Sequence, residues 1–222
     1  MQADQDGRGA DLVLLHGWGA RAHVWHDIVE LLVPKIRVHR MHLPFSGAGE
    51  VRMPYTLDTL AEEVAAVCKP DATICGWSLG GQVALRCAIK QPAKVRRLVL
   101  IAATPRFVRS ADWAHGMEPA VFDAFSKSVT QDVVGSLRRF MLLQARGDTA
   151  AREVAHRLRE YATTNGDIDT EGHGGGLKRR KETDVGAKLT DNSQRARVVH
   201  GKRAEGGRRG ERGKSEGEWE QA

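Results

Sequence analysis

The sequence has few cysteines, no long apolar run and no block of one-signed charge, and each shortage excludes a class of protein. Three cysteines among 222 residues, Cys68, Cys75 and Cys87, are too few and too irregularly spaced for a disulfide scaffold or a zinc ribbon. No apolar run reaches the roughly 18 residues of a membrane helix. Residues 1–10 are polar, so no signal peptide is expected. We therefore expect a cytoplasmic protein that holds no metal and binds no membrane.

The charge distribution gives no sign of a nucleic-acid partner. Lys and Arg number 34 against 28 Asp and Glu, a net charge of +6. Residues 1–165 hold 21 basic and 17 acidic side chains, and residues 166–222 hold 13 and 11. Because neither part is a strongly basic block, and Trp219 is the one aromatic residue of the second part, we expect no nucleic acid to bind.

The composition changes near Gly166. The 57 residues from there onward contain 12 of the 24 glycines and only 11 hydrophobic residues, too few to offset the entropy of ordering by burial. We expect disorder from Gly201 onward. The predicted division is an α/β core in 1–109, a helical cap in 110–165, a degraded remainder of the core in 166–204 and a disordered Gly/Arg/Glu tail in 205–222.

The first part of the chain alternates strands and helices, which predicts a parallel α/β sheet. Apolar or alternating runs predict strands at 12–16, 36–43, 72–77 and 97–103, and helical spacing predicts helices at 22–33, 56–68 and 79–90. Thr56 is the expected N-cap of the second helix. Residues 110–163 show no clear strand and instead predict helices at 119–129, 131–144 and 149–163. Such an insert is typical of a cap that closes over a site at the carboxyl ends of the strands.

The motif Gly76-Trp77-Ser78-Leu79-Gly80 has the pattern G-x-S-x-G between a predicted strand and a predicted helix. Glycines two residues before and two after the serine permit a tight turn that exposes the hydroxyl at the start of the helix. The backbone N–H of Leu79 then points toward a developing oxyanion. An ordinary glycine-rich turn is the alternative interpretation.

The motif His16-Gly17-Trp18-Gly19 follows the first predicted strand. In α/β-hydrolases this loop supplies the second oxyanion donor, here the backbone N–H of Trp18. The Trp18 side chain can also serve as a packing aromatic, and the two roles are compatible because the donor is backbone.

Four segments together resemble the carboxylesterases of biotin synthesis: LVLLHGWGA, GWSLGGQVAL, ALRCAIKQPAKVRRLVLIAATPRF and FMLLQARG. The resemblance covers about residues 11–165 and extends raggedly to 204. It implies an α/β-hydrolase fold and a serine esterase, without a cofactor, that acts on the methyl ester of pimeloyl-acyl-carrier protein. Ser78 would be its nucleophile, Trp18 and Leu79 its oxyanion donors, and Phe140 to Gln144 the lining of its acyl pocket.

The resemblance also implies a docking surface for the acidic acyl carrier protein. Arg139 and Arg152 match basic cap positions of the family, and a basic surface is a sensible dock for an acidic carrier and its phosphate. A solvated helical face is the alternative, because Arg is a good helix former. Nothing in the sequence points beyond a monomer.

The sequence has no clear candidates for the acid and the histidine that complete a catalytic triad with Ser78. In this fold an acid and then a histidine follow the serine. Ala204 stands at the family's acid position, with Glu205 beside it as a weak substitute, and only His173 and His200 follow the cap.

The fold's last strand and helix are also not evident in the sequence, which a slipped coding frame would explain. Besides the carrier esterase, two alternatives stay open: another small α/β-hydrolase esterase, and a catalytically dead relic lacking the triad Asp and His.

Overall fold

The fold is built on one sheet of seven strands, seen in a computed structural model that describes residues 1–44, 56–144, 153, 156–157, 195–199 and 217–218. The strand order is β1-β3-β2-β4-β5-β6-β7. The outer pairs β1–β3 and β6–β7 are antiparallel, and the inner pairs are parallel. The strands are β1 (Ala3–Asp6), β2 (Ala10–Leu15), β3 (Ile36–Met41), β4 (Ala72–Trp77), β5 (Val95–Ile101), β6 (Arg195–Val199) and β7 (Gly217–Glu218).

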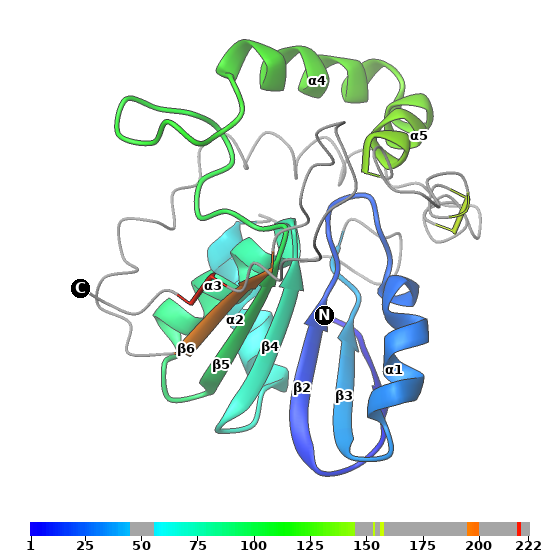
Figure 1. The fold of residues 1–222 in the computed structure, drawn as a ribbon, viewed down its shortest axis with the longest axis vertical. Helices are drawn as coiled ribbons and strands as arrows, with labels where there is room; N and C mark the ends of the chain where they lie inside the picture. Colours follow the sequence, from blue (N-terminus) through cyan, green and yellow to red (C-terminus); the bar gives the residue numbers. More distant parts are fainter. Residues whose placement is uncertain (45–55, 145–152, 154–155, 158–194, 200–216, 219–222) are drawn as a thin grey trace, which may run out of the picture.

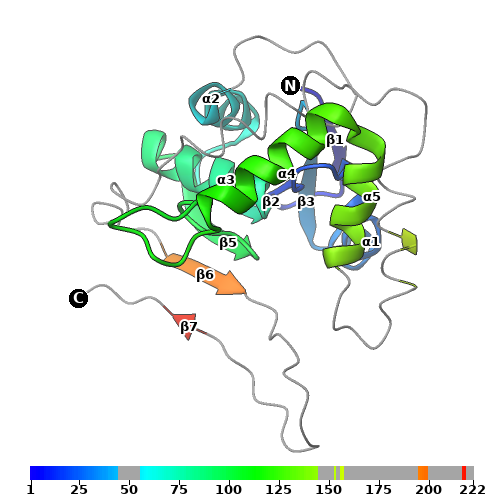
Figure 2. The same cartoon turned by 90° about the horizontal axis from the view of Figure 1, so that it is seen from above.

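Helices cover both faces of the sheet and the carboxyl ends of its strands. Figures 1 and 2 show α1 on one face, α2 and α3 on the other, and α4 and α5 above the strand ends. They are α1 (His26–Leu32) with a preceding 3-10 turn (Ala22–Trp25), α2 (Leu57–Val67), α3 (Leu79–Lys90), α4 (Pro119–Gln131) and α5 (Val133–Gln144). The α/β sheet with an alternating strand–helix order is therefore confirmed.

The predicted bounds hold best where the local signals are strongest. β4 and α3 have the expected residues, and Thr56 caps α2: its Oγ1 accepts the N–H of Thr59 at 3.1 Å. β5 begins two residues earlier than expected. The expected helix at 149–163 falls largely outside the described residues. β7 lies within the stretch expected to be disordered, most of which is also outside them.

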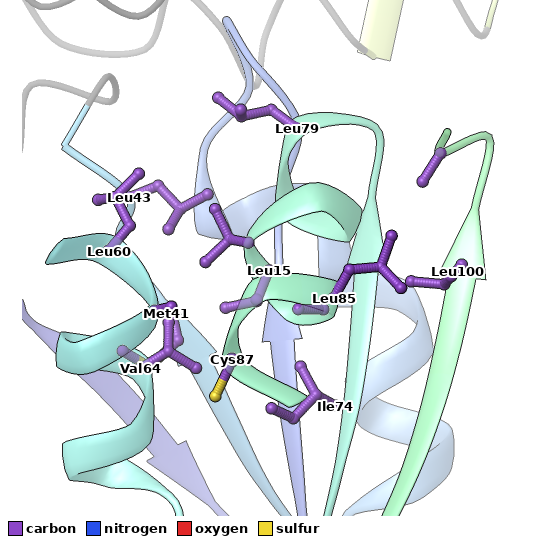
Figure 3. Close-up of a cluster of buried hydrophobic side chains, with 14 of the residues drawn as sticks. Leu15, Met41, Leu43, Leu60, Val64, Ile74, Leu79, Leu85, Cys87 and Leu100 are labelled. Carbon is purple, nitrogen blue, oxygen red and sulfur yellow. The ribbon is translucent and has the colours of Figure 1, made fainter. Parts of the chain in front are cut away.

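The larger core lies between the sheet and the helices α2 and α3 (Figure 3). Leu15 and Ile74 from the central strands, and Val64 from α2, have no exposed surface. Burial of such side chains is the main favourable contribution to folding. Cys68, directly after α2, and Cys87 of α3 are both buried in this same core. This packing holds α3, and with it the start of that helix, against β2 and β4.

The strand β1 was not expected, because its sequence ADQD is polar. It forms an edge strand beside β3, and basic side chains of β3 and of the residue just after it face its carboxylates. Arg40 Nη2 donates to Asp6 at 2.8 Å, and His42 Nε2 lies 2.9 Å from Asp4. Opposite charges on neighbouring strands stabilise the pair, so the charge pattern of β3 accounts for this strand.

A further ionic cluster links β2 to β3. The Asp11 carboxylate lies 2.6 Å from His39 Nε2 and 3.4 Å from Arg37 Nη1. Burial by itself would raise the pKa of Asp11, but the hydrogen bond with His39 and the positive charges of Arg37, His39 and Lys69 hold the pKa below its ordinary value of 3.8. A carboxylate with a lowered pKa stabilises the folded state in its ionised form.

Asp11→Asn should lower the free energy of unfolding at pH 7 by about 1–2 kcal/mol, because the ionic hydrogen bonds are lost. The contribution of Asp11 is fully present above its unfolded pKa of 3.8 and disappears as the pH falls through the lower folded value. Denaturant unfolding of both proteins between pH 7 and pH 3 measures it. The difference should shrink below about pH 4; a constant difference down to pH 3 would contradict this account.

Candidate active site

Ser78 occupies the turn between β4 and α3, and it is the only residue between them. Its backbone angles, φ 54° and ψ −115°, lie outside the regions that residues with side chains normally adopt. Backbone hydrogen bonds hold it there: the N–H of Ser78 donates to the carbonyl of Ile101 at 2.9 Å, and its carbonyl accepts from the N–H groups of Gly81 at 3.0 Å and Gln82 at 3.3 Å. The strand–turn–helix context of the motif is therefore confirmed, while the catalytic role of Ser78 stays a prediction.

The motif glycines are required by close backbone packing. A Cβ on Gly76 would overlap the carbonyl of Gly80, and a Cβ on Gly80 would overlap the carbonyl of Leu15 and lie 2.7 Å from that of His16. No side chain can relieve either clash, because the obstacles are backbone atoms. The glycines thus let the first turn of α3 sit directly against the end of β2.

The loop 16–19 lies beside Ser78 because β2 and β4 are parallel neighbours, with Leu15 paired to Gly76. The carboxyl ends of the two strands therefore open at the same edge. A Cβ on Gly17 would lie only 3.3 Å from the Ser78 Cβ. The structure thus brings together the two motifs that the sequence predicts to form an oxyanion site.

His16 fixes the shape of this loop. Its side chain is fully buried. Nε2 accepts the backbone N–H of Leu43 at 3.0 Å, and Nδ1 lies 2.9 Å from the carbonyl of Gly17. Because Nε2 is an acceptor, Nδ1 carries the proton and donates to Gly17. This histidine connects the loop to the chain that follows β3.

The expected oxyanion donors are backbone groups at this same edge. The N–H of Ser78 is already bonded to Ile101. Leu79 is the first residue of α3, and N–H groups in the first turn of a helix have no acceptor within the helix. Its position, with Trp18 in the adjoining loop, is compatible with the predicted pair of donors.

An aromatic cluster stands over the loop. The Trp18 ring is buried and packs edge-on against Phe125 of α4 and Phe140 of α5, with centroid distances of 5.6 and 5.3 Å. The two phenyl rings are 5.8 Å apart. Phe140 was expected to line a pocket here. Phe125 was missed, and the apolar spacing of Phe122, Phe125 and Val129 along α4 is the signal that could have found it.

The α5 helix approaches the loop closely at Gly19. This glycine has φ 73°, and a Cβ there would overlap the side chain of Leu137 and lie 3.4 Å from Met141. Both of those side chains are buried. A residue larger than glycine at position 19 would push α5 away from the loop.

The remaining predicted positions are only partly described. Gln144 is the last residue of α5, but its side chain is outside the described part, as is Arg152. Arg139 is 59% exposed and donates to Ser128 and Ser136. Its guanidinium therefore already has partners within the protein.

The candidates for the base and the acid, His173, His200, Ala204 and Glu205, all lie outside the described residues. Three described histidines have carboxylate partners: His26 with Glu30 on the exposed side of α1, His39 with Asp11, and His42 with Asp4. His39 and His42 belong to the region of β3, which β2 separates from β4. The His42–Asp4 pair belongs to the β1–β3 edge, and the His39–Asp11 pair to the cluster that links β2 to β3.

The described residues contain neither a group of side chains suited to a metal ion nor a helix suited to a membrane. Among residues 1–44 and 56–144 and the short described pieces beyond them, no three His, Cys, Asp or Glu side chains are grouped so as to hold a metal ion. In the same part of the chain, no helix is long and apolar enough to cross a bilayer.

Comparison with known proteins agrees with this geometry. The model of the alpha/beta hydrolase family matches residues 12–194, and the chain belongs to that family. A relative from Nitrosomonas europaea, named pimeloyl-[acyl-carrier protein] methyl ester esterase, is 38% identical over 196 residues, covering 88% of this chain and 78% of its own. A relative of the same name from Stenotrophomonas maltophilia (strain K279a) is 43% identical over 167 residues, covering 75% and 64%. The resemblance seen in the sequence is confirmed.

Solved structures support the fold. An esterase from Exiguobacterium antarcticum superposes with a TM-score of 0.77 at 21% identity, covering 88% of this chain and 75% of its own. A hydrolase from Pseudomonas aeruginosa PA01 gives 0.71 at 25% identity, covering 90% and 75%. The expected class, a carboxylic ester hydrolase by family, is confirmed by the named relatives.

Gly80→Ala should destabilise the protein more than Gly17→Ala. The added methyl group meets backbone carbonyls at position 80, whereas at position 17 its nearest contacts are side-chain atoms of Trp77 and Ser78 at 3.2–3.4 Å. We expect Gly80→Ala to cost about 1–3 kcal/mol or more, measured by denaturant unfolding. Equal losses in the two variants would show that the elbow is less tightly packed than described.

Proposed function

We propose that the chain is a serine carboxylesterase that hydrolyses the methyl ester of pimeloyl-[acyl-carrier protein] and frees the pimeloyl carboxylate. The observation that carries the proposal is the placement of Ser78, in a strained turn beside the loop 16–19 and at the edge that α4 and α5 cover. The names of the relatives support the substrate.

In the proposed mechanism, Ser78 Oγ attacks the ester carbonyl carbon, and its proton passes to a general base. The N–H groups of Trp18 and Leu79 stabilise the oxyanion of the tetrahedral intermediate. The intermediate collapses by breaking the bond to the methoxy oxygen, which takes the proton and leaves as methanol. Water then attacks the acyl-enzyme, releasing the carboxylate and restoring Ser78.

The acyl chain would bind against the aromatic cluster. Phe125 and Phe140 pack on Trp18, which gives an apolar surface over the loop that adjoins Ser78, and the predicted lining extends along α5 to Gln144. A polymethylene chain gains affinity by leaving water for such a surface. No metal or organic cofactor takes part in the proposed chemistry.

The carrier would dock on the outer side of the helices above the sheet. Arg139 and the sequence-adjacent Arg138 are both exposed on α5, and Arg152 follows in the sequence. Positive charge at this edge would attract an acidic carrier and the phosphate of its prosthetic group. We further propose that the protein acts as a monomer in the cytoplasm.

A fluorophosphonate probe tests the nucleophile. The folded protein should be labelled at Ser78, as mapped by peptide mass spectrometry, and Ser78→Ala should abolish the label. Methanol release from pimeloyl-carrier methyl ester should fall by roughly 10³-fold or more in the same variant. A cooperatively folded protein that takes no label would instead be the catalytically dead relic.

A panel of esters separates the proposal from its other alternative. The carrier-bound pimeloyl ester should be preferred over free esters of the same acid, because only the carrier offers charges to the basic surface. Equal hydrolysis of both would favour another small esterase of the family.

Phe140→Ala should reduce kcat/KM for the pimeloyl ester by about 10–100-fold, and for an acetyl ester much less, because the ring contacts only the longer chain. Val121→Ala is the matched control: it removes apolar atoms from α4 at a side chain that is 56% exposed, and it should leave both rates unchanged. Similar losses for the two esters in Phe140→Ala would contradict a pocket at this position.

A further inference from the structure

The helices α4 and α5 meet at a tight corner. Asp132 is the only residue between them. Its N–H donates to the carbonyl of Ser128 at 2.9 Å, and its Oδ1 accepts the N–H of Gly135 at 2.8 Å. The carboxylate of Asp132 thus caps the start of α5.

Arg139 closes this corner from the second turn of α5. Its Nη2 donates to the Oγ of Ser128 and to the Oγ of Ser136, each at 3.0 Å, and the two hydroxyl oxygens are 2.9 Å apart. Nη2 carries two hydrogens, so each serine receives one. The Asp132 carboxylate lies 3.7 Å from the same nitrogen. These four residues, Ser128, Asp132, Ser136 and Arg139, form the corner cluster.

Removal of the Arg139 guanidinium should destabilise the corner cluster. Ser136 is only 1% exposed, and a buried hydroxyl that loses a partner destabilises the fold. The bond to Ser128 also joins α5 to the last turn of α4. Without Arg139, the hydroxyl contact between Ser128 and Ser136 is what remains of this polar link, beside the apolar contact of Phe125 with Phe140.

The residues that this corner holds in place are those of the aromatic cluster. Phe125 lies one turn before Ser128 on α4, and Phe140 lies one turn after Ser136 on α5. Both rings rest on Trp18. Because a helix moves as a rigid body, a change in the angle at the corner shifts one phenyl ring relative to the other.

We infer that Arg139 is a positioning residue of the acyl-binding surface, acting through the corner cluster. The inference deepens the proposed function, on which its substrate rests, and differs from the docking role. Docking predicts that Arg139 matters only for a substrate attached to the carrier. Positioning predicts that it also matters for an uncharged, carrier-free diester.

The variants separate the two roles. Arg139→Ala removes both the charge and the corner bonds, whereas Ser128→Ala removes a corner bond and no charge. Lys127→Ala is the control, because it removes a positive charge at an exposed position of α4. Each change is made in the Ser78→Ala protein, so that ligand binding is measured without turnover.

Two measurements follow, hydrogen exchange of the peptides that contain Phe125 and Phe140, and the affinity for dimethyl pimelate by calorimetry. Arg139→Ala and Ser128→Ala should speed exchange about tenfold and weaken diester binding about fivefold. The double variant should lose less than the product of the two single losses, because both changes act on one cluster. Lys127→Ala should behave like the parent.

Unchanged exchange and unchanged diester affinity in Arg139→Ala would overturn the inference and leave docking as the role of this residue. If the parent protein binds no dimethyl pimelate, the proposed binding of the acyl chain against the aromatic cluster is wrong. In that case the exchange of the two phenylalanine peptides still decides whether Arg139 holds the corner.

Discussion

The close backbone contact between the first turn of α3 and the end of β2 is the constraint on which the site depends. Gly80 permits it, since any side chain there would meet the carbonyls of Leu15 and His16. This contact draws the loop after β2 against the turn after β4. It also leaves Ser78 no relaxed conformation, because its N–H and carbonyl are already bonded to Ile101 and Gly81. The strained backbone conformation of Ser78 is therefore maintained by backbone contacts with the sheet and with α3, not by side chains of the active site.

The site divides its tasks between two kinds of structure. The groups expected to meet the developing charge are backbone atoms, fixed by parallel strands and by His16 beneath the loop. The groups expected to meet the acyl chain are side chains of α4 and α5, which rest on Trp18 through edge-on ring contacts. Preorganised dipoles suit the chemical step, while apolar side chains on separate helices can vary without disturbing it.

The sequence predicts the elbow and the central strands well because their signals are local. Apolar runs and glycine spacing suffice for β4, Ser78 and α3. The sequence is less informative where a partner decides the outcome. β1 reads as a polar loop and becomes a strand through the basic side chains of β3. The role of Phe125 depends on its contact with Trp18, and the role of Arg139 depends on its hydrogen bond to Ser128 on another helix. Local spacing can mark Phe125 as a partly buried position of α4, but no local pattern indicates which residue on another element it contacts.

The order of the strands has a consequence for how the protein acquires its site. β2 and β4 are neighbours in the sheet, yet β3 and α2 lie between them in the chain, and α5 follows later still. The contacts among the loop 16–19, the turn at Ser78 and the helices α4 and α5 therefore join distant parts of the sequence. Contacts of this kind form slowly, because the chain must close long loops first. The oxyanion loop, the elbow and the aromatic cluster thus come together only when the sheet is assembled, so a partly folded chain has the motifs without the site.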